Sequence, residues 1–149
     1  MSFGPSLSRL LRLRRSLERQ EELKLAMASG RMHAARAGLE QAQDAGRRQQ
    51  QAVRAELSGQ LSGAELQSAD WQRGVASARE RRLAGELEAA QAAQADQRRT
   101  LLERTRERKT LDTLQAHSRE ADLKQELRRE QAELDEAFLR ALISDRTRD

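Results

Sequence analysis

The chain has 149 residues, the length of one ordinary domain, but only three of them are aromatic. So few aromatic side chains argue against a compact globular core. Charged residues make up 35% of the chain and hydrophobic residues 37%, and the net charge is only +4, so charges of both signs are mixed. This composition is typical of long helices and argues against a charge-swollen disordered chain.

The chain contains no cysteine, which excludes a disulfide framework and a thiolate metal site. No apolar run approaches the length of a bilayer span. Arginines at positions 9, 12, 14 and 15 interrupt the leucines near the N-terminus, where a signal peptide would need an apolar core. We therefore expect a protein that remains in the cytoplasm.

A first helix is predicted from about residue 6 to residue 57. Pro5 is the only proline, and Ser6 or Ser8 after it can cap a helix. Apolar residues then recur at steps of three and four, as in a coiled-coil seam: Leu10, Leu13, Leu17, Leu25, Ala28, Met32, Ala35, Leu39, Ala42, Val53 and Leu57. The jump from Leu17 to Leu25, and Gly46 and Gln49 at seam positions, predict an irregular supercoil.

A turn is predicted at residues 58 to 62. Gly59 can adopt the left-handed conformation that ends a helix, and Ser62 with Glu65 forms a capping-box pattern for a second helix. That helix should run from about residue 63 to residue 143 without a proline, and both chain ends should be frayed.

These elements predict an all-α fold, a long two-helix antiparallel coiled-coil hairpin with unequal arms, which forms a single domain over residues 1–149 and remains monomeric. Folding back at the turn would bring position n beside roughly position 120 minus n. About thirty residues at the end of the second helix would then overhang the first.

Folding back would also align two basic stretches, which we name the basic collar: Arg12, Arg14, Arg15 and Arg19 with Arg98, Arg99, Arg104, Arg106, Arg108 and Lys109. The collar is interpreted either as a solvated basic face or as a surface that meets an acidic partner. That partner could be a protein ring, an anionic membrane or nucleic acid. Within the overhanging part of the second helix, the stretch from Glu120 to Glu136 is mostly acidic.

Trp71, Val75, Ala78 and Arg82 form a stripe of their own on the second helix, at i, i+4, i+7 and i+11. One interpretation is that the stripe thickens the seam near the turn. The other is that Trp71 is an exposed aromatic anchor for a partner protein, since tryptophan is over-represented at binding hot spots.

Catalytic chemistry is not indicated. His33 and His117 lack the ligand partners of a metal site, and we expect both to be solvated. There is no Gly-rich phosphate loop and no nucleophile with a base nearby, and a two-helix rod offers no water-excluding pocket. We therefore predict a protein that is not an enzyme and holds no metal or cofactor. Gly30, Gly38 and Gly46, spaced eight residues apart, indicate either close helix packing or a flexible segment.

The second half of the chain resembles the flagellar FliJ family. The resemblance rests on the segment Leu101-Leu-Glu-Arg-Thr-Arg-Glu-Arg-Lys109, on Leu111 and Leu114, and on Glu130-Gln-Ala-Glu-Leu-Asp-Glu136 followed by Ala137 and Arg140. The leucine- and arginine-rich start, the turn and the long second helix agree with it.

The resemblance implies a stalk-like component of the flagellar type III protein export apparatus, which acts in flagellum assembly, motility and chemotaxis. Its implied partners are the hexameric export ATPase, the membrane export-gate protein and the export chaperones, at the cytoplasmic face of the inner membrane, where its association would be peripheral. The gate-binding residues would be Trp71, Val75, Ala78 and Arg82. The residues facing the ATPase ring would be Arg12, Arg15, Arg104, Arg108, Lys109, Leu134 and Phe138.

Three alternatives stay open from the sequence. The first is the equivalent stalk of a virulence-type secretion system. The second is a basic coiled coil that binds nucleic acid, which is disfavoured by the acidic residues mixed along both helices and by the lack of aromatic side chains among the basic ones. The third is a generic structural coiled coil.

Overall fold

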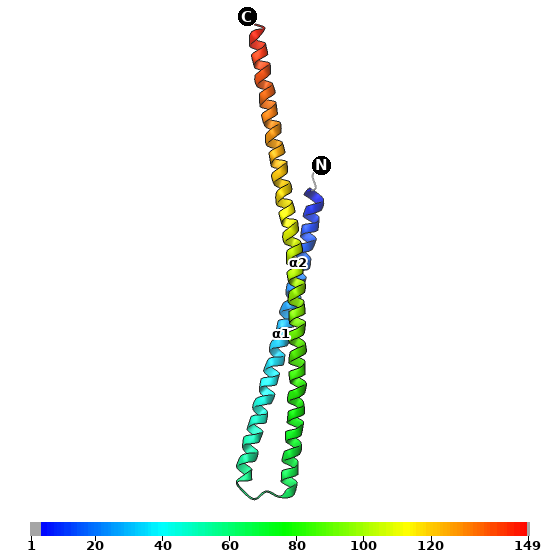
Figure 1. The fold of residues 1–149 in the computed structure, drawn as a ribbon, viewed down its shortest axis with the longest axis vertical. Coiled ribbons are helices and arrows are strands. Elements are labelled where there is room, and N and C mark those ends of the chain that lie inside the picture. Colours follow the sequence, from blue (N-terminus) through cyan, green and yellow to red (C-terminus); the bar gives the residue numbers. More distant parts are fainter. Residues whose placement is uncertain (1–3, 149) are drawn as a thin grey trace. The chain divides into compact units, whose positions relative to one another are not determined.

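The computed structural model describes residues 4–148. Two helices, α1 (Gly4–Leu57) and α2 (Gly63–Arg146), pack against each other as an all-α helical hairpin, which confirms the predicted fold class (Figure 1). The helices contain 54 and 84 residues. Fraying was predicted for both chain ends, and part of that prediction falls on residues 1–3 and 149, which lie outside the described residues.

The start of α1 differs from the expected one. The helix begins at Gly4, so Pro5 occupies its first turn, where a proline costs no hydrogen bond and its fixed φ suits the helix. Ser6 and Ser8 lie inside the helix, and the capping role predicted for them is wrong.

The connection between the helices follows the capping box but not the predicted glycine conformation. The Glu65 N–H donates to Ser62 Oγ and the Ser62 N–H donates to Glu65 Oε2, both at 3.3 Å, which confirms the capping box. Gly59 does not adopt a positive φ. Its N–H instead donates to the Glu56 carbonyl at 2.9 Å, and the Ser58 hydroxyl donates to the Ala55 carbonyl at 2.6 Å. Because these donors satisfy terminal carbonyls of α1, the helix ends without a left-handed residue.

The chain divides into two units. Unit 1 contains Met1–Glu18 and Arg104–Asp149, and unit 2 contains Arg19–Glu103 with the turn. In each unit a segment of α1 lies antiparallel to a segment of α2. Gln115 Nε2 donates to Ser8 Oγ in unit 1, and Gln94 Nε2 donates to Ser29 Oγ in unit 2. Both pairs join position n to a position near 120 minus n, as predicted. That the whole chain is a single domain stays a prediction.

The seam between the helices is thin. The hydrophobic side chains buried among the described residues are Leu11, Met32 and Ala42, and the buried polar one is Glu21. Shielded positions of α1 recur every three or four residues, through Arg14 and Glu18 in unit 1 and onward from Glu21 in unit 2. Contrary to what the sequence had suggested, the seam is therefore not interrupted between Leu17 and Leu25, because Glu18 and Glu21 occupy the seam positions there.

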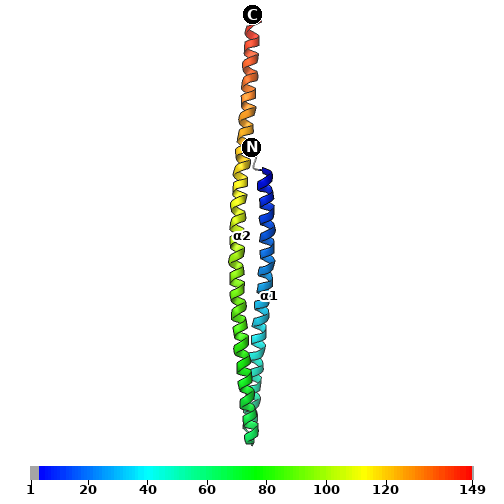
Figure 2. The same ribbon diagram turned by 90° about the vertical axis from the view of Figure 1, so that its right-hand side faces the viewer.

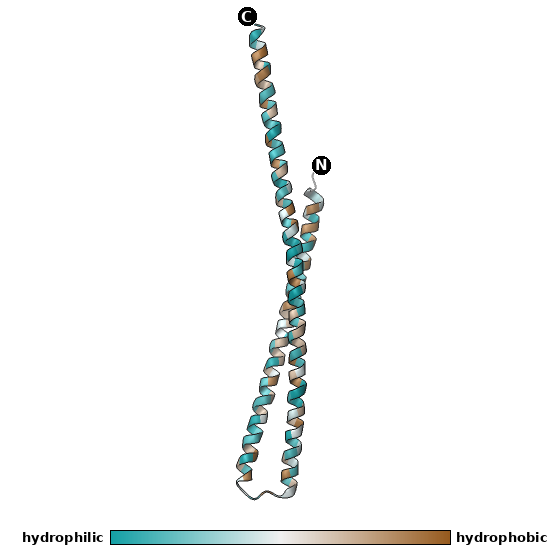
Figure 3. Cartoon of the chain, in the orientation of Figure 1, coloured by the Kyte–Doolittle hydropathy of each residue, from teal (hydrophilic) through white to brown (hydrophobic). Residues whose placement is uncertain are grey.

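In unit 1, α2 continues well past the start of α1. Every described residue after Ser118 is exposed, and both views show no helix beside the last part of α2 (Figures 1 and 2). We name residues 119–146 the overhang. Hydrophobic and hydrophilic residues alternate along it (Figure 3). None of the described helices is long and apolar enough to cross a membrane.

The glycines of α1 differ in what surrounds them. A Cβ added at Gly30 would meet nothing within 4 Å, whereas one added at Gly46 would lie 2.7 Å from Glu80 Oε1. Close approach of another group is thus seen at Gly46 and not at Gly30.

We expect Gly30→Ala to raise the free energy of unfolding by about 0.5–1 kcal/mol, because alanine loses less backbone entropy than glycine in a helix. Gly46→Ala should gain less, because Glu80 must move. Urea unfolding followed by circular dichroism compares the two. An equal gain in both variants would contradict the assigned environment of Gly46.

Candidate functional site

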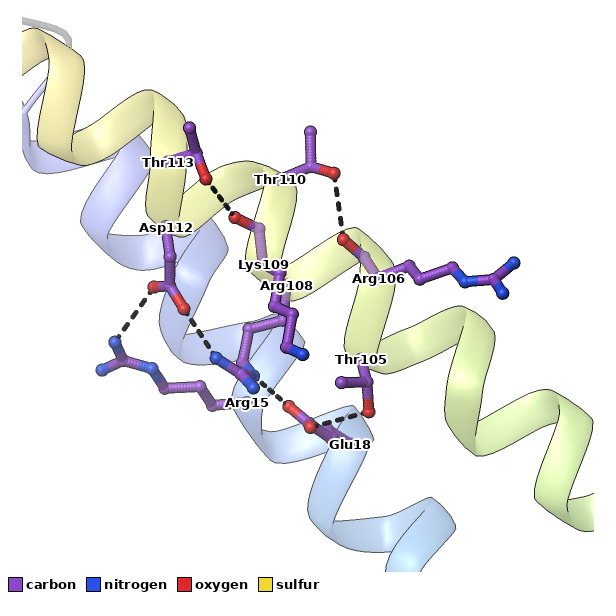
Figure 4. A network of polar contacts seen from close by, with 9 residues as sticks. All are labelled: Arg15, Glu18, Thr105, Arg106, Arg108, Lys109, Thr110, Asp112 and Thr113. Carbon is purple, nitrogen blue, oxygen red and sulfur yellow. Dashed lines mark hydrogen bonds and ion pairs between the residues drawn. The ribbon is translucent and has the colours of Figure 1, made fainter.

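Five polar side chains join the two helices of unit 1, and we name this set the polar clasp (Figure 4). Arg15 and Glu18 come from α1, and Thr105, Arg108 and Asp112 come from α2. The Glu18 carboxylate accepts hydrogen bonds from Thr105 Oγ1 at 2.9 Å and from Arg108 Nε. Arg108 Nη1 also donates to Asp112 Oδ2 at 2.6 Å. Asp112 Oδ1 in turn accepts from Arg15 Nη2 at 3.2 Å, which returns the network to α1.

A second ion pair crosses between the helices beside the clasp. Arg14 Nη1 donates to Glu107 Oε2 at 2.5 Å, and Arg104 Nη1 reaches the same oxygen at 3.4 Å. The buried Arg14 Nε has no hydrogen-bond partner among the described residues. The charge of Arg14 is therefore balanced while its donors are incompletely satisfied.

Hydrogen bonds within the clasp change the pKa of two of its members, Glu18 and Arg108. The side chain of Glu18 is 12% exposed and that of Arg108 is 24% exposed. Burial alone would raise the pKa of Glu18, but the hydrogen bonds from Arg108 and Thr105 and the nearby positive charge outweigh it, and the net pKa is lowered. Hydrogen bonds to Glu18 and Asp112 raise the pKa of Arg108. Glu18 and Arg108 are therefore both held in their ionised forms at neutral pH.

Polar pairs also connect the helices in unit 2. Gln97 Nε2 donates to the buried Glu21 carboxylate and to its backbone carbonyl. Gln49 Nε2 donates to Gln72 Oε1 at 2.8 Å. A polar residue in a coiled-coil seam costs stability when it is mispaired, so such pairs favour one register over its neighbours. Apolar contacts hold the helices together in each unit, and the polar pairs fix how they align.

The clasp changes the interpretation of the basic collar within unit 1. Arg15, Arg104 and Arg108 each have a carboxylate partner, and so only part of their charge is open to another molecule. Arg12 and Lys109 are exposed and form no ion pair among the described residues. Of the residues predicted to face a ring, these two offer the free positive charge.

The carboxylates that pair with these arginines in unit 1 were not predicted from the sequence. Glu18, Glu107 and Asp112 were overlooked because the basic residues around them were grouped by their positive charge alone. One local signal was available, because Arg108 and Asp112 stand at i and i+4, where opposite charges meet on a helix. The pairing of Glu18 across the helices required the register as well.

The four residues of the Trp71 stripe are all exposed, in the part of α2 that belongs to unit 2. Trp71 is 70% exposed and Val75 is 50% exposed, and Ala78 and Arg82 are exposed as well. Most of the tryptophan residue is therefore left open to solvent. Trp71 and Val75 border an open groove of about 250 Å³ whose opposite wall is formed by α1 residues including Ala42 and Gly46.

Leu134 and Phe138 lie on the overhang and are about two-thirds exposed. His33 and His117 are exposed, and the described residues contain no group of three or more potential metal ligands among His, Cys, Asp and Glu. The arrangement can therefore hold two helices in register and present exposed faces to other molecules.

We expect the stabilisation provided by Glu18 to disappear in acid. Its pKa is lowered in the folded protein, so the unfolded chain takes up the proton first as the pH falls, and the contribution present above about pH 4.5 is lost as the pH passes through the lowered pKa. Urea unfolding of the wild type and of Glu18→Gln should show a stability difference that shrinks below pH 4.5. A difference that stays constant down to about pH 2 would contradict the role of the Glu18 charge.

Comparison with known protein families matches the chain to the family described as Flagellar FliJ protein, over residues 3–147. No curated protein and no solved structure matched the chain. The family match covers both helices and the turn between them. The chain therefore belongs to the FliJ family of flagellar proteins.

Proposed function

We propose that this protein is a stalk-like component of the flagellar type III export apparatus, which links the export ATPase ring to the membrane export gate and assists the cycling of export chaperones. Membership of the FliJ family makes it a flagellar, export-related protein. The observation that carries the finer proposal is the overhang, a stretch of α2 that is exposed on all sides within its unit. A helix without neighbours can enter an opening in a partner assembly.

The ATPase ring is proposed to meet unit 1. The exposed Arg12 and Lys109 supply positive charge that no carboxylate of the described residues neutralises, and Leu134 and Phe138 supply apolar surface on the overhang. Arg15 and Arg108 contribute mainly by holding α1 against α2 in the clasp, whereas Arg104 pairs with Glu107 of its own helix. Rim charges of this kind steer association, while exposed apolar side chains add affinity once they are covered.

The export gate is proposed to meet the Trp71 stripe. An exposed tryptophan beside a groove lined by small residues can anchor a partner protein, because its large ring is covered at little cost in side-chain entropy. This would place the protein peripherally at the cytoplasmic face of the inner membrane. The proposed role is one of binding rather than catalysis. The pairing of the clasp arginines with carboxylates argues against a nucleic-acid surface in unit 1.

For the ring contact, we expect the double variant Arg12→Glu/Lys109→Glu to bind the purified export ATPase of the same organism several-fold more weakly at low salt, because charge reversal at exposed positions slows association. The clasp remains intact in this variant. Arg31→Glu/Arg36→Glu in unit 2 is the matched control, since these arginines are also exposed. Equal loss in both variants would show a general effect of net charge and contradict the ring contact.

For the gate contact, we expect Trp71→Ala to raise the Kd for the cytoplasmic domain of the export-gate protein by about tenfold, as is typical of a tryptophan hot spot. Thermal unfolding should change little, because the ring is 70% exposed. Leu66→Ala, another exposed apolar position of α2, is the control and should bind normally. Unchanged binding by Trp71→Ala would exclude the stripe as the gate site.

A further inference from the structure

The overhang carries an apolar stripe that no described residue covers. Leu123, Leu127, Leu134, Phe138 and Leu142 recur along the helix at steps of four and seven, and each is about half exposed or more. Side chains at such spacing share one face of a helix. Five large apolar side chains on one exposed face form a surface of the kind that partner proteins bind.

This stripe does not continue the seam with α1. The α2 residues shielded by α1 in unit 1 include Arg104, Arg108, Leu111, Gln115 and Ser118. At 3.6 residues per turn, the centre of the stripe is rotated from the centre of all shielded α2 residues of unit 1, with Thr105 and Asp112 included, by an angle on the order of 120°. A molecule that covers the stripe must therefore approach α2 from a different side than α1.

The stripe is interrupted by a charge. Glu130 stands seven residues after Leu123, on the same line of the helix, between Leu127 and Leu134. Glu126 and Glu133 border this side of the stripe. None of these three carboxylates forms an ion pair within residues 4–148, whereas nearby Glu120 and Glu136 pair with Lys124 and Arg140. The face therefore offers apolar surface with unpaired negative charge in its middle and along one edge.

A second copy of the chain fits this face poorly. In a parallel pair in register, Glu130 would face Glu130 of the second copy. In an antiparallel pair that places Leu127 against Phe138, Glu130 would lie beside Asp135 of the second copy. Two carboxylates brought together out of water repel each other, and both of these pairings are therefore opposed.

We propose that the stripe binds a segment of a different protein whose apolar side chains cover Leu127 and Leu134 and whose arginine or lysine meets Glu130. An opposite charge at a polar seam position fixes register and partner choice together. The proposal rests on the proposed function, in which the export ATPase is the partner of unit 1, and it assigns to that partner an apolar groove with a basic side chain within it.

The test measures binding of full-length variants to the purified export ATPase. Leu127→Ala/Leu134→Ala should raise the Kd about tenfold or more, and Glu130→Lys at least several-fold. The matched controls lie on the other side of the overhang and should stay within about twofold of the wild type. They are Leu139→Ala/Ile143→Ala, which removes equally exposed apolar side chains, and Asp122→Lys, which reverses an exposed carboxylate.

Circular dichroism establishes that each variant keeps the helical content of the wild type, and sedimentation of the chain alone reports its oligomeric state. Loss of binding in both stripe variants with normal binding by the controls supports the proposal. Normal binding by Leu127→Ala/Leu134→Ala overturns it and leaves the proposed function in place. A wild type that fails to bind the ATPase overturns both. A dimer that dissociates in Leu127→Ala/Leu134→Ala identifies a second copy as the occupant and overturns the proposal as well.

Discussion

The carboxylate of Glu18 accepts hydrogen bonds from two residues of α2, and one of them, Arg108, passes the interaction on to Asp112. A seam that buries so few hydrophobic side chains has little apolar area with which to choose among alignments. A shift of α1 by one turn along α2 would leave Glu18 without its partners, in a place only 12% exposed to water. Because unpaired buried charge is far costlier than paired charge is stabilising, the clasp acts mainly by penalising other registers.

The other polar pairs between the helices also disfavour alternative registers. Gln97 meets the buried Glu21, Gln94 meets Ser29, and Gln49 meets Gln72, so unit 2 repeats the device with glutamine amides as the donors. Such pairs add little net stability, because water would satisfy the same groups in the unfolded chain. Their contribution is alignment, and alignment decides which residues are left outside the seam. The exposure of Arg12 and Trp71 and the length of the overhang follow from this alignment of the helices.

Much of the fold could be predicted from the sequence, because it depends on local signals. The recurrence of apolar residues every three or four positions predicted the helices, and the capping box of Ser62 and Glu65 predicted the start of α2. The helix end at Gly59 was misjudged, because backbone and hydroxyl donors can satisfy terminal carbonyls in more than one way. The clasp could not be predicted, because grouping arginines by charge hides a glutamate that faces them across the helices. Side-chain pairing of that kind needs the register first, and the register came from the turn.

The overhang shows what a formed helix provides for the chain that follows it. Starting an isolated helix in water is unfavourable, since the first turn fixes many dihedral angles for a single hydrogen bond. In unit 1 the paired part of α2 has already formed that nucleus, so the overhang only needs elongation, residue by residue. Internal pairs such as Lys124 with Glu120, Arg140 with Glu136, and Gln131 with Asp135 assist it. Helical order can therefore extend into solvent from a template, and the face of Leu127 and Leu134 is arranged before anything covers it, so less conformational entropy is lost when it is covered.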